Sequence, residues 1–73
     1  TAMITKQVTD IKPGDLIYSV FDNVLIVLEN RFMGIKPYDG HIGVYKLTCL
    51  YKGNIVRLAP NSVKCYTLLN DRS

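Results

Sequence analysis

The side chain with the most obvious capacity for catalysis is the single histidine, His41. Asp39 stands two positions before it, in a stretch punctuated by glycine. A histidine acts as a general base only when a nucleophile and an orienting group lie within hydrogen-bond reach. The sequence gives no ground for placing Ser19, Ser62 or Cys49 near His41. The pattern favours a loop histidine with local hydrogen bonds, and we predict no catalytic residue.

Cys49 and Cys65 are the two cysteines, and they can act as a pair only if their strands are adjacent. Otherwise each is a small hydrophobic side chain suited to a core. Neither belongs to a Cys/His spacing that is typical of a zinc site. The segment Gly40-His41-Ile42-Gly43 lacks the helix that follows a phosphate-binding loop. We predict a non-enzymatic protein with no cofactor and no metal ion.

The elements that must position these side chains are strands. Val24 to Leu28 is a run of five apolar residues, three of them β-branched, with polar residues at both ends. It is too short to span a membrane and favours a β-strand. Its even-numbered residues share one face, while Leu25 and Val27 share the other. One small core takes only one of these faces, and we expect Leu25 and Val27 to lie on the face that binds a partner.

Turn residues divide the rest of the chain into short β-prone segments. Ile11-Lys12-Pro13-Gly14-Asp15 has type II turn chemistry, because proline presets the first central position and glycine accepts the positive φ of the second. Ile4 to Thr9 is either a short edge strand or an ordered arm. Further strands are predicted from Leu16 to Phe21, Gly43 to Tyr51, Ile55 to Ala59 and Val63 to Leu69. Their connections are predicted at Asp22-Asn23 (a tight reversal), Lys52-Gly53-Asn54 (a hairpin turn) and Pro60-Asn61-Ser62 (one turn of 3₁₀ helix).

Period-two alternation assigns the faces of two of these strands. The inward residues are predicted to be Tyr45, Leu47, Cys49, Tyr51, Val56 and Leu58. Lys46, Thr48 and Arg57 then face water. The strand from Leu16 to Phe21 is apolar in either register, so the sequence leaves its buried face open.

The segment from Phe32 to His41 is predicted to be a loop, because Gly34, Pro37 and Asp39-Gly40 interrupt it. Loops of this length in small domains often carry function. Its apolar residues either fold over an open end of the molecule or act as exposed anchors. The candidate partner-binding residues of the loop are Phe32, Met33, Ile35 and Tyr38.

Tyrosine and basic residues support nucleic-acid binding as the alternative function. Five tyrosines occur in 73 residues without tryptophan, and tyrosine suits both protein interfaces and base stacking. The candidate nucleic-acid contacts are Tyr18, Lys36, Lys46 and Arg57. The net charge of +3 comes from nine basic and six acidic residues, and the basic ones are scattered singly. Such scattering favours a solvated surface over a phosphate-binding patch.

Length and composition set the remaining limits. A chain of 73 residues has room for one domain, whose small core leaves little net stability, so self-association is a plausible source of more. Residues 1–2 are treated as a cloning remnant, 1–10 as the arm or edge strand, 11–69 as the folded unit and 70–73 as a polar tail. No apolar run is long enough for a membrane anchor, and the sparse cysteines fit the cytoplasm.

Five short strands, a long loop after the second and a proline-marked turn before the last resemble a small SH3-like β-barrel. Lys12-Pro13-Gly14-Asp15-Leu16-Ile17 and Val24 to Glu29 carry the likeness. The pattern is similar to the KOW modules of ribosomal and transcription-elongation proteins and to small SH3-like accessory proteins of bacteriophages. Asn23 stands where a KOW module has glycine, and basic clustering is missing. The resemblance implies a five-stranded barrel that binds a host protein or itself, in the host cytoplasm if phage-encoded.

Overall fold

The protein is all-β in the computed structural model, which describes residues 2–19 and 23–70. Within these residues, one antiparallel sheet contains six strands, and a 3₁₀ turn, η1 (Val8–Asp10), follows the first of them. The strands are β1 (Ala2–Gln7), β2 (Leu16–Tyr18), β3 (Val24–Lys36), β4 (Asp39–Tyr51), β5 (Asn54–Leu58) and β6 (Cys65–Asn70). The segment before the first turn is therefore an edge strand. The end of the strand predicted to reach Phe21, and Asp22 of the reversal after it, lie outside the described residues.

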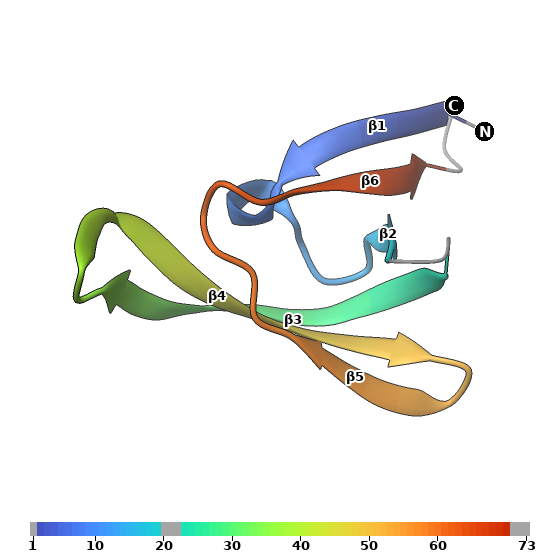
Figure 1. The fold of residues 1–73 in the computed structure, drawn as a ribbon. Coiled ribbons are helices and arrows are strands. Elements are labelled where there is room, and N and C mark those ends of the chain that lie inside the picture. Colours follow the sequence, from blue (N-terminus) through green and yellow to red (C-terminus); the bar gives the residue numbers. More distant parts are fainter. Residues whose placement is uncertain (1, 20–22, 71–73) are drawn as a thin grey trace.

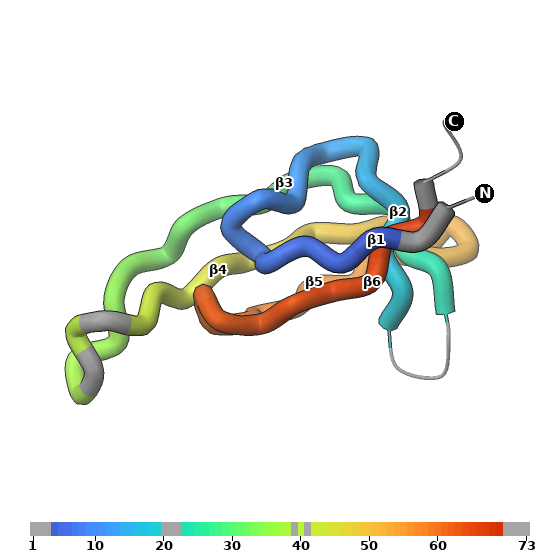
Figure 2. The backbone as a smooth tube through the Cα atoms, turned by 90° about the horizontal axis from the view of Figure 1, so that it is seen from above, coloured from blue at the N-terminus to red at the C-terminus, as the bar shows by residue number. Residues whose placement is uncertain are grey.

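The strands follow the order β1-β6-β2-β3-β4-β5, so the last strand in the chain pairs between the first two. The sheet curls strongly, which brings β1 and β6 above β3, β4 and β5 (Figure 1). Seen from above, β6 passes over β5 (Figure 2). The edge strands β1 and β5 do not pair with each other, so the sheet is open. The described residues therefore form an open six-stranded sheet and not the predicted closed five-stranded barrel.

Turn chemistry sets the entry into β2 and the β4–β5 hairpin. Gly14 has φ +94° and the Asp15 amide donates to the Lys12 carbonyl at 3.1 Å, as in the predicted type II turn. Lys52 and Gly53 both have positive φ, at 49° and 79°. Positive φ at both central residues is the geometry of a type I′ turn, whose twist matches that of the strands it joins. The type II turn is therefore confirmed. The hairpin turn lies where it was predicted, but its central pair is Lys52-Gly53 and Asn54 already belongs to β5.

The core lies on the inner face of the curled sheet. Its buried members come from η1, from the turn before β2 and from four strands: Val8, Ile11, Ile17, Leu25, Val27, Leu47, Cys49 and Leu68. Partly buried side chains pack around them: Tyr45, Tyr51, Val56, Leu58 and Tyr66. The predicted inward residues of β4 and β5 are confirmed, and β2 buries Ile17.

The segment predicted to be a loop is a long hairpin instead. β3 and β4 each contain 13 residues and pair as far as Lys36 and Asp39, so only Pro37 and Tyr38 form the turn. The far part of this hairpin extends beyond the rest of the molecule (Figures 1 and 2). Gly34 has φ +122° beside a register shift, which is a β-bulge within a strand. The glycine marks a bend of the ribbon and not an interruption of it.

The connection between β5 and β6 crosses β4. Val44 bridges to Asn61, and the Tyr45 amide donates to the Pro60 carbonyl at 2.9 Å. The chain then reverses in a turn in which the Lys64 amide donates to the Asn61 carbonyl. The predicted 3₁₀ turn at residues 60–62 is absent from this described segment, because the backbone groups there pair with β4 instead.

Candidate interaction surface

The two faces of the apolar run in β3 differ in solvent exposure. Leu25 and Val27 are 2% and 0% exposed, while Ile26 and Leu28 are 40% and 44% exposed. The expectation that Leu25 and Val27 bind a partner is wrong, because they form part of the core. A free apolar face does exist, but it is the even-numbered side of the run.

Ile26 belongs to a line of apolar residues that crosses the outer face of the sheet. Strand register places it directly opposite Leu16 on one side and Leu50 on the other. Leu16 lies opposite Leu69, and Leu50 opposite Ile55. Directly opposed side chains of an antiparallel pair share a face and touch. We call these five residues, from β6, β2, β3, β4 and β5, the apolar row.

The apolar row is exposed at two of its five positions. Ile26 and Ile55 are exposed, and Leu16, Leu50 and Leu69 are half-buried. Leu28, at the register shift after Val27, adds a further exposed apolar side chain to β3. None of the five row residues was predicted from the sequence as a partner-binding residue, because each belongs to a different strand and only the register brings them together.

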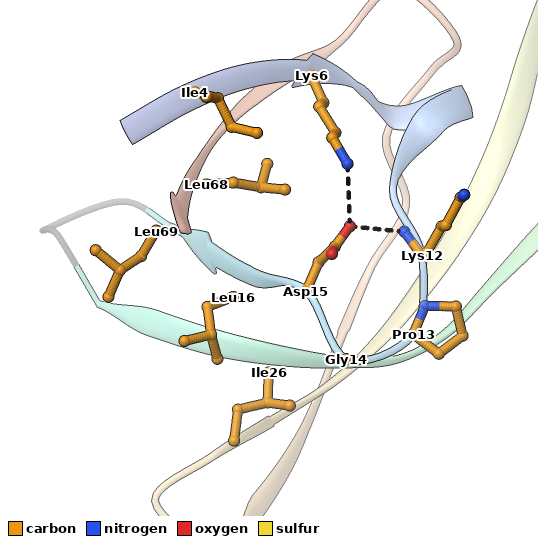
Figure 3. Close-up of a pocket in the computed structure, with 10 residues that line it drawn as sticks. All are labelled: Ile4, Lys6, Lys12, Pro13, Gly14, Asp15, Leu16, Ile26, Leu68 and Leu69. Atoms are coloured by element: carbon orange, nitrogen blue, oxygen red, sulfur yellow. Dashed lines mark hydrogen bonds and ion pairs between the residues drawn. The ribbon is translucent and has the colours of Figure 1, made fainter. Parts of the chain in front are cut away.

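A groove of about 640 Å³ lies at the β6 end of the apolar row. Leu16, Ile26 and Leu69 line it from the row, and Ile4 lines it from β1 (Figure 3). At its polar end, Asp15 accepts from the Lys12 amide at 2.9 Å and pairs with the Lys6 ammonium at 3.9 Å (Figure 3). The carboxylate is satisfied within the chain, so the groove offers an apolar floor with two lysines at its rim.

Polar residues run beside the apolar row on the same outer face. The next positions along β3, β4 and β5 are Glu29, Thr48 and Arg57, which are opposed in register. Two residues further on, Arg31 lies directly opposite Lys46. The outer face thus combines an apolar half with a polar half that is mainly basic.

The nucleic-acid candidates do not form one cluster. Lys46 and Arg57 share the outer face and are diagonal neighbours, since Arg57 lies opposite Thr48. Lys36 is at the end of β3, beside the hairpin turn. Tyr18 lies opposite Val24, on the other side of the apolar row from the two cations. Two of the four candidates are neighbours and two are separate.

The far part of the β3–β4 hairpin carries the apolar residues first assigned to a loop. Phe32, Met33 and Ile35 are each about half exposed, and Tyr38 at the turn is 99% exposed. The Phe32 ring packs on Tyr45 with centroids 5.2 Å apart. A Cβ at Gly43 would lie 2.8 Å from the Phe32 ring, so the absence of a side chain at Gly43 leaves room for that ring. These candidates are exposed as expected, but on strands and a two-residue turn.

The two cysteines do not act together. Cys49 is fully buried on β4 and Cys65 is exposed on β6, and these strands are not neighbours in the sheet. Burial raises the pKa of the Cys49 thiol. Burial also raises the pKa of Tyr66, with a further increase from the nearby Cys49. Both groups are held neutral inside the molecule, which suits packing and not nucleophilic chemistry.

The remaining chemical features are sparse. The side chains of Asp39 and His41 lie outside what the structure describes. Elsewhere in residues 2–19 and 23–70, no group of three His, Cys, Asp or Glu side chains is placed to hold a metal ion. Within the same described ranges, no helix has the length and apolarity needed to cross a membrane.

Comparison of the chain with models of protein families, with curated proteins and with solved structures finds no match in any of the three. The surface described above therefore carries the functional argument by itself.

Proposed function

We propose that this chain is a non-enzymatic protein-interaction module whose binding surface is the outer face of the sheet. The observation that carries the proposal is the part of the apolar row on the adjacent strands β3, β4 and β5, where Ile26 and Ile55 are exposed on either side of half-buried Leu50. Contiguous exposed apolar surface with a polar border is typical of protein-binding sites. A single exposed leucine would carry no such meaning, but a register-aligned line of five does.

The architecture is consistent with this role. We propose that the curl of β2 to β6 is SH3-like, with β1 added at one edge beside β6. A small rigid sheet holds its surface side chains in fixed positions, which lowers the entropy lost when a partner binds. Function then lies in the surface that the scaffold presents and not in a pocket for chemistry.

The test places a charge in the apolar row. Ile26→Lys and Ile55→Lys each insert an ammonium group at an exposed position of the row, where it remains solvated in the free protein but would be buried against a partner. Val63→Lys is the matched control, because Val63 is 62% exposed and lies in the turn between β5 and β6, away from the row. Circular dichroism checks that all three variants keep the native fold.

Each protein is immobilised and used to capture binding partners from an extract of its source cells, and light scattering measures its own oligomeric state. The proposal predicts that Ile26→Lys and Ile55→Lys each lose at least tenfold in affinity for a captured protein, or lose self-association, while Val63→Lys retains it. A wild type that is monomeric and whose captured proteins all bind Ile26→Lys equally well would refute the proposal.

Nucleic-acid binding is the second candidate function, and one observation favours it. Arg31, Lys46 and Arg57 are grouped on the outer face although basic residues are scattered along the sequence. Labelled single-stranded and duplex oligonucleotides can be titrated at two salt concentrations, since phosphate contacts give an affinity that falls steeply with salt. This function predicts binding at low salt that weakens as salt rises, and it fails if no oligonucleotide binds at low salt.

A further inference from the structure

Arg31 and Lys46 stand directly opposite each other on the outer face of β3 and β4. Like charges in this position destabilise a sheet, whereas opposite charges contribute favourably. The ion pair of the described residues joins Lys6 and Asp15, so no described carboxylate lies within ion-pair distance of Arg31 or Lys46. The chain retains a locally unfavourable pairing at a place where one acidic substitution would relieve it.

A third cation strengthens the same site. Arg57 lies opposite Thr48, and Lys46 is two residues from Thr48 on the same strand face. Diagonal neighbours of this kind are about 7–8 Å apart, within reach of long side chains. Glu29, which also lies opposite Thr48, is the acidic residue beside these three cations. Three cations therefore face one carboxylate, and we call Arg31, Lys46 and Arg57 the basic cluster.

The basic cluster lies at a fixed distance from the apolar row. Leu50 of the row and Lys46 of the cluster are both on β4, four residues apart and on the same face. At about 3.3 Å per strand residue, the two positions are separated by roughly 13 Å. The strands that carry them, β3, β4 and β5, lie side by side (Figure 1). A single partner surface can therefore touch both.

We propose that the partner of the outer face is an acidic protein surface, with an apolar anchor on the row and a group of carboxylates on the basic cluster. This inference rests on the proposed function and specifies its partner. A carboxylate group placed between Arg31 and Lys46 converts their repulsion into two charge-assisted contacts. The unfavourable pairing in the free chain is thus compensated only in the complex.

Two other occupants fit these observations less well. A second copy of this chain brings the same three cations and a net charge of +3, so copies that face each other through this surface add to the repulsion. A nucleic acid would satisfy the cations, but its phosphate backbone gains little from an adjoining line of five aliphatic side chains. Charge and apolarity together favour an acidic protein.

The test uses a random 16-residue peptide display library selected on the immobilised wild-type chain. Enriched peptides are synthesised with a fluorescent label and their affinities are measured by anisotropy. Lys46→Glu removes the central cation and places a carboxylate directly opposite Arg31, so that the cross-strand pair carries opposite charges. Lys64→Glu is the control, because it makes the same change of charge at an exposed lysine in the turn before β6.

The proposal predicts enrichment of peptides that combine aspartate or glutamate with apolar residues. Lys46→Glu weakens their binding about tenfold, whereas Lys64→Glu changes it less than twofold. When the acidic residues of a peptide are exchanged for lysine, that peptide binds Lys46→Glu more tightly than it binds the wild type. Lys46→Glu also raises the thermal midpoint of the free protein, because the strand pair then carries opposite charges. Weaker binding by a more stable protein cannot result from misfolding.

Three results would overturn the inference, and each has its own meaning. Enriched peptides without an acidic excess, bound equally by Lys46→Glu but lost on Ile26→Lys, would leave the interaction function standing with a neutral partner. Oligonucleotide binding that depends on Lys46, without acidic-peptide binding, would assign the cluster to nucleic acid. Failure to enrich any peptide, with self-association that Ile26→Lys abolishes, would make a second copy the occupant.

Discussion

The inner and outer faces of β3 differ although their side chains are alike. Leu25 is 2% exposed and Ile26, its neighbour, is 40% exposed. Leu25 lies opposite Ile17 in the core, whereas Ile26 lies opposite Leu16 on the outside. The side chains are isomers, so hydrophobicity does not separate them. Their roles are set by the direction in which the turn at Lys12 to Asp15 delivers β2 and by the curl of the sheet around one face.

The inner face is expected to determine stability and the outer face to determine recognition. This division would be contradicted if inner-face mutations changed binding without changing stability, or if outer-face mutations changed stability without changing binding. The three predictions below test it, beginning with the largest expected change in the free energy of unfolding.

Leu25→Ala should lower the free energy of unfolding by about 2–5 kcal/mol, because it removes a buried side chain and leaves a cavity. Ile26→Ala should lower it by about 1 kcal/mol or less, since the position is partly exposed and contributes only cross-strand contacts. Urea denaturation followed by circular dichroism measures both. If Leu25→Ala does not fold, Leu25→Val and Ile26→Val form a milder pair. Equal losses for the two positions would show that the faces are not distinct.

Asn30 is the polar exception on the inner side of β3. Its side-chain amide donates to the carbonyls of Val8 and Ile11 at 2.8 and 2.9 Å, which fastens η1 and the following turn to β3. Its own Oδ1 has no partner among the described residues. Asn30→Asp, which lacks both donors, should lower the free energy of unfolding by about 1–3 kcal/mol, because the Ile11 carbonyl loses its donor and the Val8 carbonyl keeps only the Ile11 amide.

The local readout for Asn30 is hydrogen exchange of the Ile11 amide, which donates to Val8 at 3.2 Å. Asn30→Asp should accelerate the exchange of this amide, relative to the wild type, by a larger factor than it accelerates the exchange of amides in the β4–β5 hairpin. Asn54→Ala, at an exposed position that begins β5, is the control and should change the free energy of unfolding by about 0.5 kcal/mol or less. Uniform acceleration across the sheet would show that Asn30 acts globally and not as a local fastener.

Substitution of a cysteine should change the free energy of unfolding least at neutral pH. The reactivity of the two thiols should distinguish the buried inner face from the exposed outside most clearly. A thiol reagent should modify exposed Cys65 in the native protein and reach buried Cys49 only on unfolding. Because the folded pKa values of Cys49 and Tyr66 are raised, from ordinary values of 9.0 and 10.0, folding favours their neutral forms. That stabilisation is complete below about pH 9 and is lost as the pH rises through the folded values. The urea midpoint of Cys49→Val should therefore fall less between pH 8 and pH 10 than that of the wild type.

Native modification of both thiols at equal rates would contradict the burial of Cys49. A midpoint with the same alkaline decrease in the wild type and in Cys49→Val would assign the pH dependence to other groups.

Local chemistry predicted the local structure. The turns at residues 11–15 and 52–54 followed from proline and glycine, and the inner face of β4 followed from alternation, because Lys46 and Thr48 mark its outer side. Where these marks are missing, prediction failed. The run from Val24 to Leu28 is apolar on both sides, so alternation carries no information about which side is buried.

The projecting hairpin was missed for a different reason. Gly34, Pro37 and Asp39-Gly40 predicted a loop, yet each is compatible with a β-hairpin. Gly34 lies at a β-bulge, Pro37 lies in the two-residue turn, and Asp39-Gly40 begins β4. The apolar row and the basic cluster were beyond reach, because both are products of register across several strands. A sequence specifies which residues alternate, but not which ones stand opposite each other three strands away.

The pairing of β1 with β6 has a consequence for how the molecule is made. β6 inserts between β1 and β2, so β1 makes no sheet contact with any strand that precedes β6 in the chain. During translation the first strand must wait, unpaired, until the last has left the ribosome. Contacts between such remote segments close the largest loop and form slowly. The nascent chain therefore exposes two incomplete strand edges until β6 has emerged, and that interval is when this sheet is most vulnerable to aggregation.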